Sequence, residues 1–115
     1  MNFLHFQSVG GASGDMVLGA LGSLGLDLQA VEELVNKLPI EPVRFRVEAM
    51  SSHGCHGIRV VVETSESETT PHRTLHDIET MISATSLPGG AAESSLRVFR
   101  RLAEAEGIVH QKPVE

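Results

Sequence analysis

The residues best suited to chemistry lie in the stretch Val9–Met16, which reads VGGASGDM. Apolar residues precede it and an amphipathic stretch follows, a pattern that predicts a buried strand, a tight glycine turn and a helix start. Ser13 suits the N-cap, and the Asp15 carboxylate could hold a metal ion or satisfy helix N–H groups. Backbone N–H groups converge at such a junction and could bind phosphate, which makes the candidate binding residues Gly10, Gly11, Ser13, Gly14 and Asp15. A sharp corner without a ligand explains the same residues.

Histidines form two further groups. His53, Cys55 and His56 are soft ligands in one turn, but three ligands in four residues close a tetrahedral metal site poorly, and a polar exposed turn is the simpler interpretation. His72 and His76 are four residues apart. They could share a metal only if a helix began before residue 74, and two solvated histidines are the alternative. The candidate metal ligands are therefore Asp15, His72 and His76.

Composition narrows the class of protein. The chain has 115 residues, of which 41% are hydrophobic and 3% aromatic, so we expect one domain with an aliphatic core at residues 1–107 and a tail at 108–115. The formal net charge of −6 argues against a nucleic-acid or anionic-membrane surface. The single cysteine excludes an internal disulfide, and no signal peptide or membrane-length apolar run is visible, so we expect a cytoplasmic protein.

The hydrophobic periodicity predicts the order strand, helix, helix, strand, strand, helix, helix. We expect strands at residues 3–9, 43–50 and 58–64, and helices at 14–24, 27–38, from 74 onward and at 91–106. The second and third strands should form a hairpin, and residues 65–74 should form a mobile surface loop. This order indicates an α+β fold, a small three-stranded mixed sheet with helices packed on one face.

Local signals refine these elements. Asp27 and Thr74 are predicted helix caps, and Thr74 with Asp77 resembles a capping box. In the first helix, glycines recur every third residue, which is costly unless another backbone packs against that face. These glycines are Gly19, Gly22 and Gly25.

The chain resembles the N-terminal part of the LarC-type nickel-insertion proteins, which complete the nickel-pincer cofactor of lactate racemase. The turn of that family matches Gly11 and the run Ser13–Met16, and the hairpin glycines Gly54 and Gly57 match as well. Further matches are His72–Leu75, the helix Phe99–Glu106 with Val109-His110, and the ending Pro113–Glu115. The resemblance therefore spans nearly the whole chain.

The resemblance implies a role in inserting nickel into the pyridinium-3,5-bisthiocarboxylic acid mononucleotide, in a CTP-dependent reaction of a cyclometallase. The turn Gly10–Asp15 would hold an anionic group or the metal, and His72 would assist metal delivery. CTP and Mg²⁺ or Mn²⁺ are expected only for a second half, which is absent here, so this chain should not catalyse alone. Its expected partners are the mononucleotide precursor and the remaining C-terminal part of the family protein.

The sequence also departs from the family pattern. Gln7 and Ser8 replace an aspartate and a cysteine beside the turn, and the histidine tract is reduced to His72, with His76 after it. Two other interpretations remain open. One is a non-catalytic scaffold for homo-oligomerisation or docking, suggested by the glycine-spaced helix face and the small sheet, and the other is a small-anion-binding module.

Overall fold

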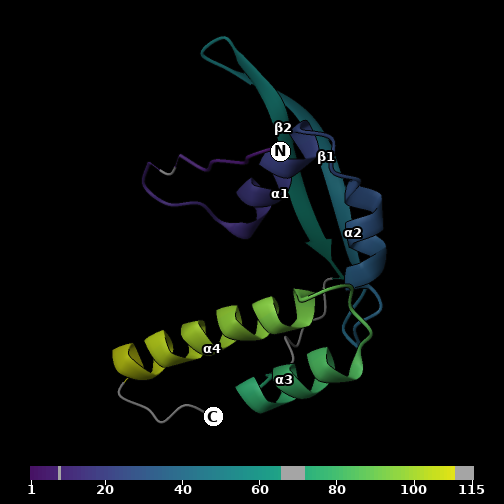
Figure 1. Ribbon diagram of the computed structural model, residues 1–115, viewed down its shortest axis with the longest axis vertical. Coiled ribbons are helices and arrows are strands. Elements are labelled where there is room, and N and C mark those ends of the chain that lie inside the picture. The colour runs from purple at the N-terminus through teal and green to yellow at the C-terminus, as the bar shows by residue number, and fades with distance from the viewer. Residues whose placement is uncertain (8, 66–71, 111–115) are drawn as a thin grey trace. The chain divides into compact units, whose positions relative to one another are not determined.

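The computed structural model describes residues 1–7, 9–65 and 72–110 (Figure 1). Within them the fold is α+β, with four helices and one two-stranded antiparallel sheet. The chain groups into two compact units, the first made of residues 1–32 and 43–64, the second of 33–42 and the described part of 65–115. The helices are α1 Gly14–Ser23, α2 Leu28–Val35, α3 Leu75–Ala84 and α4 Ala91–His110, and the strands are β1 Val43–Ser52 and β2 Cys55–Thr64.

The hairpin of the first unit is confirmed, and it is longer than predicted. β1 and β2 pair from Val43↔Thr64 to Ser52↔Cys55, leaving a two-residue turn. His53 and Gly54 both have positive φ, 50° and 79°, as a tight hairpin turn with the right-handed strand twist requires. One face of the hairpin carries Val60, which is 1% exposed. The opposite face is charged, with Arg46 paired to Glu48 and Glu63.

Helix α1 packs against β2 through its glycines, as their spacing predicted. A Cβ atom on Gly19 would lie 2.8 Å from the backbone oxygen of Ile58, so only glycine permits this approach without movement. Gly25 follows the helix with a φ of 100°. Its N–H donates to the Gly22 oxygen while the next N–H donates to the Leu21 oxygen, which ends the helix in a Schellman motif. Gly19 and Gly22 of the glycine face therefore pack against Ile58 of β2 within the chain.

The predicted caps of the other helices are present. Asp27 accepts hydrogen bonds from the backbone N–H groups of Gln29 and Ala30 at 3.1 and 3.2 Å, which starts α2. Thr74 and Asp77 form a complete capping box at the start of α3. The ends differ from prediction, since α2 stops at Val35 and its last predicted turn relaxes into short-range turns.

In the second unit, α3 and α4 pack together around Ile82, which is 4% exposed. An ion pair from Arg100 to Glu79, at 2.6 Å, joins the two helices. Arg73 donates to both carboxylate oxygens of Glu41 at 2.9 Å, which ties residues 33–42 to the start of α3. Among the described residues, no helix combines the length and apolar character needed to cross a bilayer.

Two predictions about the ends of the chain are wrong. Residues 1–7 form no strand, and Phe3 is 87% exposed, so the three-stranded sheet is not formed by the described residues. An apolar run becomes a strand only when another strand completes its hydrogen bonds, and no strand in the described part of the chain pairs with these residues. At the other end α4 continues to His110, beyond the predicted helix end at residue 106. The tail at residues 108–115 stays a prediction. Residues 66–71 of the predicted loop and residues 111–115 lie outside the described part. The single domain at residues 1–107 stays a prediction.

Candidate functional site

The first candidate site is the turn before α1, residues 10–15, which we call the glycine corner. Gly10 and Gly11 have φ of 83° and 88°, a backbone conformation that other residues rarely adopt. A Cβ atom on either glycine would meet nothing within 4 Å, and residues 9–16 are all exposed. These glycines are therefore required by backbone conformation, and the corner is open to a ligand rather than filled by neighbouring side chains.

Ser13 occupies the N-cap position of α1 but does not cap the helix with its side chain. Its hydroxyl donates instead to the Asp15 carboxylate two residues later. The backbone oxygen of Ser13 accepts the first helical hydrogen bond, from the Val17 N–H at 3.1 Å. The predicted N-cap is thus correct in position, but the Ser13 side chain donates to Asp15 and accepts no hydrogen bond from the helix amides.

Asp15 is the charged group of the corner. The hydrogen bond from the Ser13 hydroxyl lowers the pKa of the Asp15 carboxyl, and the backbone N–H groups of Met16 and Asp15 and the positive charge of Arg59 lower it further. Asp15 is therefore ionised at neutral pH and exposed. Because the carboxylate already interacts with the first-turn amides, an incoming anion would have to compete with it. A divalent cation would gain a negatively charged oxygen ligand.

The second candidate site lies at the start of α3. His72 precedes the helix and His76 is its second residue, both exposed, so the two imidazoles do not form a helical i, i+4 pair. Between them the Thr74 backbone N–H and hydroxyl lower the pKa of Asp77, with smaller contributions from His76 and His72. The helix thus begins where the capping box predicted, which excludes the earlier start that a histidine pair on one helix face requires.

No group of three or more His, Cys, Asp or Glu side chains among the described residues is arranged to hold a metal ion. The described residues of the hairpin turn therefore form no metal site. Cys55 is exposed there, and the ring of His53 interacts with the Ser52 hydroxyl at 2.9 Å. The same applies to Asp15, which belongs to the first unit, and to His72 and His76, which belong to the second. Any metal bound by these residues would need further ligands from elsewhere.

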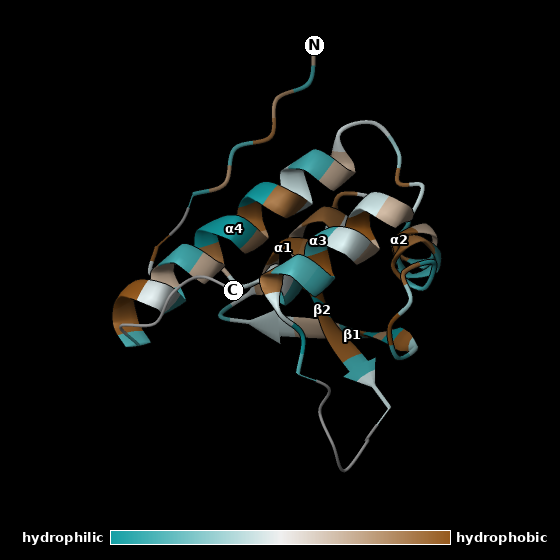
Figure 2. Ribbon diagram, turned by 90° about the horizontal axis from the view of Figure 1, so that it is seen from below, coloured by the Kyte–Doolittle hydropathy of each residue, from teal (hydrophilic) through white to brown (hydrophobic). Residues whose placement is uncertain are grey.

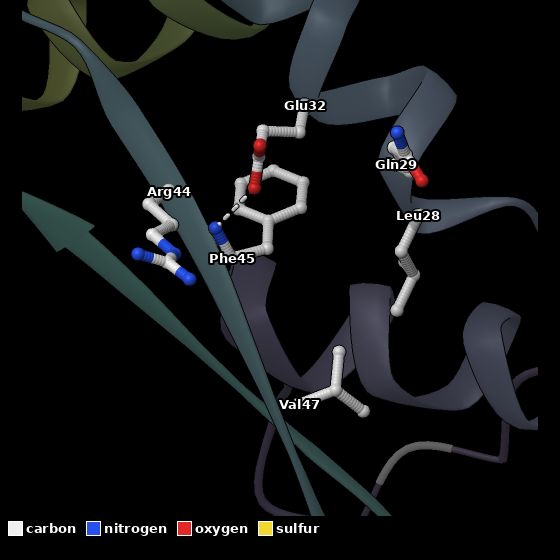
Figure 3. A pocket seen from close by; sticks show the side chains of 6 residues that line it. All are labelled: Leu28, Gln29, Glu32, Arg44, Phe45 and Val47. Atoms are coloured by element: carbon white, nitrogen blue, oxygen red, sulfur yellow. Dashed lines mark hydrogen bonds between the residues drawn. The ribbon is translucent and has the colours of Figure 1, made fainter.

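The structure also contains a pocket that sequence reasoning missed. It lies between α2 and the outer edge of β1 and has a volume of about 270 Å³ (Figure 3). The Glu32 carboxylate accepts a hydrogen bond from the Phe45 N–H at 2.6 Å. It thereby satisfies a backbone donor at the sheet edge that a neighbouring strand would otherwise satisfy. No local sequence signal identifies this pocket, because its central hydrogen bond joins residues 13 positions apart. The lining residues are Leu28, Gln29, Glu32, Arg44, Phe45 and Val47.

The fold and the corner together define a small α+β module with an open, glycine-built turn and an ionised acid at the start of a helix. The chain belongs to the nickel insertion protein family, whose sequence model matches residues 4–115. No solved structure matches it.

Relatives with curated names carry the same designation. The chain is 35% identical over its whole length to a nickel insertion protein of Wolinella succinogenes, and it covers 29% of that protein. It is 38% identical over its whole length to one of Thermomicrobium roseum, of which it covers 28%. Over 87% of the chain it is 41% identical to the pyridinium-3,5-bisthiocarboxylic acid mononucleotide nickel insertion protein of a Nocardioides strain, covering 25% of it. The chain therefore spans less than a third of the length of these relatives.

Proposed function

We propose that this chain corresponds to the N-terminal part of a protein that inserts nickel into pyridinium-3,5-bisthiocarboxylic acid mononucleotide, and that the glycine corner contacts the nickel ion. The name of the Nocardioides relative supports the reaction, and the family match over residues 4–115 supports its transfer to this chain. Nickel is a substrate of this reaction. The chain handles it and does not complete the chemistry by itself.

The single observation that carries the role of the corner is the exposed, ionised Asp15 on an open glycine turn. One carboxylate is a weak nickel site, so binding requires other ligands to complete the coordination. The precursor supplies sulfur atoms, which are soft ligands suited to nickel, and the remainder of a full-length family protein could supply more. Asp15 would then hold the ion only until the precursor takes it, which fits a substrate better than a resident metal.

His72 and His76 are proposed as transient nickel ligands in the second unit. Both imidazoles are exposed, and neutral imidazole nitrogen is a good nickel ligand. We assign the nucleotide-dependent steps, with CTP and Mg²⁺ or Mn²⁺, to the remainder of the full-length protein.

Calorimetric titration of the 115-residue chain with Ni²⁺ tests these roles. Asp15→Asn keeps the size of the side chain and removes its charge, so we expect weaker nickel binding. Asp27→Asn is the matched control, because Asp27 caps α2 and asparagine also caps a helix. His72→Ala and His76→Ala should each remove part of the remaining binding. Equal nickel affinity in wild type and Asp15→Asn would refute a role of Asp15 in holding the ion.

A phosphate-binding corner is the second candidate, favoured by the positive φ of Gly10 and Gly11, because successive amides in such turns can form an anion-binding concavity. Here the prediction is the opposite for Asp15. Removing its charge should strengthen phosphate binding, because the carboxylate no longer competes for the first-turn amides. Titration of the same variants with inorganic phosphate separates the two candidates.

A further inference from the structure

Helix α4 carries two apolar faces, and α3 occupies only one. The half-buried face contains Leu96, Phe99 and Ala103, and the Arg100–Glu79 ion pair holds α3 on that side. The second face is open. Val98 is 66%, Leu102 56% and Val109 74% exposed. Figure 2 shows hydrophobic segments recurring among hydrophilic ones along α4.

The open face has the spacing of a coiled-coil seam. Val98, Leu102, Ala105 and Val109 are separated by four, three and four residues, which corresponds to positions d, a, d and a of a heptad repeat. With 1.5 Å of rise per residue the seam is about 16 Å long. We name these four residues the α4 seam. A surface helix that packs on one neighbour normally has one apolar face, so a second one indicates a second helix.

The charges beside the seam indicate which helix this is. Arg101 precedes the a position and Glu106 follows the d position, so they occupy g and e. In a parallel pair, a g residue meets the e residue of the other helix five positions later, so Arg101 would face Glu106 of an identical helix, and the symmetry would repeat the pair. An antiparallel pair brings g beside g and e beside e, and separates these charges.

The ion pair within α4 that pairing with a second helix would replace is weak. Arg101 pairs with Glu104 of its own helix at 3.5 Å, with side chains 87% and 59% exposed, and such a pair contributes little. The helix is already ordered by its packing on α3, so pairing does not have to overcome the entropy cost of forming a helix. We propose that α4 pairs with α4 of a second copy of this chain as a short parallel coiled coil through the α4 seam. The seam covers less than two heptads, so the association is weak.

Sedimentation equilibrium of the 115-residue chain from about 10 μM to about 1 mM tests the proposal, a range that suits a small interface. We expect the average mass of the wild-type chain to rise toward that of a dimer. Leu102→Gln should remain a monomer, and Arg97→Gln, an exposed change outside the seam, should behave as wild type. A wild-type chain that stays monomeric up to about 1 mM overturns the proposal. If Leu102→Gln also lowers the melting temperature of that monomer, the α4 seam packs against other residues of the same chain.

Charge reversal tests the register. Arg101→Glu and Glu106→Arg should each weaken dimerisation about fivefold at low salt, because each creates two like-charged pairs of about 0.5 kcal/mol each. The double variant should return to within about twofold of wild type, which a nonspecific apolar contact would not produce. Equal effects of the single and double variants contradict the paired charges.

Disulfide trapping tests the orientation. In a Cys55→Ser background, Val98→Cys should crosslink readily, because a parallel seam places residue 98 beside its copy within disulfide reach. An antiparallel pairing separates the two by about 16 Å. Arg97→Cys, which lies outside the seam, is the control for random collision. Crosslinking of Val98→Cys no faster than that of Arg97→Cys overturns the parallel arrangement.

Discussion

Replacing Gly19 by alanine should loosen α1 from β2. The added Cβ would lie 2.8 Å from the Ile58 backbone oxygen, about 0.6 Å inside the 3.4 Å at which ordinary contact begins. A backbone oxygen cannot rotate away, so the helix or the strand must shift, at a cost of about 1–3 kcal/mol. Alanine regains about 1 kcal/mol of helix propensity. We therefore expect Gly19→Ala to lower the free energy of unfolding by about 1 kcal/mol.

The same helix offers matched controls. A Cβ on Gly22 would lie 2.7 Å from the end of the Ile58 side chain and 2.8 and 3.2 Å from the Cδ1 and Cγ atoms of Leu28, which are side-chain atoms that can move. A Cβ on Gly14 meets nothing within 4 Å. Gly22→Ala should therefore be close to neutral, and Gly14→Ala neutral or stabilising, since propensity acts alone there.

Urea unfolding followed by far-UV circular dichroism measures the series, because the sequence has no tryptophan or tyrosine for fluorescence. Hydrogen exchange should localise the effect, with faster exchange in residues 55–64 and unchanged exchange in α3 and α4 of Gly19→Ala. If Gly19→Ala proves as stable as Gly14→Ala, the close approach of the helix to the Ile58 oxygen is not a determinant of stability and the reasoning fails.

Three further predictions concern the second unit. Thr74→Ala should lower the stability of α3 by about 1 kcal/mol and Thr74→Ser should restore most of it, measured by hydrogen exchange of the helix. Because the Thr74 N–H lowers the pKa of Asp77, this stabilisation should be complete above the ordinary carboxyl pKa and should be lost as the pH falls through the lowered pKa. Melting temperatures measured against pH should show this decline, and Asp77→Asn should flatten it. Arg73→Ala should lower the melting temperature, because it removes the ion pair with Glu41. Arg73→Lys should recover only part of that loss, because lysine lacks the planar guanidinium that matches a carboxylate. Equal melting temperatures of the two variants would contradict this prediction.

Features specified by neighbouring residues could be predicted from the sequence. The hairpin follows from two alternating runs around a glycine turn, and the caps at Asp27 and Thr74 follow from side chains that reach amides two or three residues away. The close contact at Gly19 was also predictable, because glycines in a helix are costly without a reason. The family resemblance was confirmed over residues 4–115.

Features that depend on distant partners could not be predicted. The apolar run at residues 3–9 has the composition of a strand, but a strand also needs an edge to pair with, and composition does not supply one. The Glu32–Phe45 hydrogen bond joins a helix to a strand edge across 13 positions of sequence. At Ser13 the sequence identified the N-cap position but not that the hydroxyl donates to Asp15 without accepting from a helix amide. The roles of Asp15, His72 and His76 stay predictions.

The local and distant determinants of the glycine corner can be separated. The groups that lower the pKa of Asp15 most are the Ser13 hydroxyl and the nearby backbone amides, all within two residues, whereas Arg59 comes from β2. A shift of α1 caused by Gly19→Ala should leave the local groups in place and alter only the distance to Arg59. The contribution of Asp15 to nickel affinity should therefore survive that substitution even as stability falls, because a cation at the corner would use the carboxylate and not the positive charge of Arg59. Phosphate binding should weaken with it, since an anion at the corner would use the positive charge of Arg59 as well as the amides.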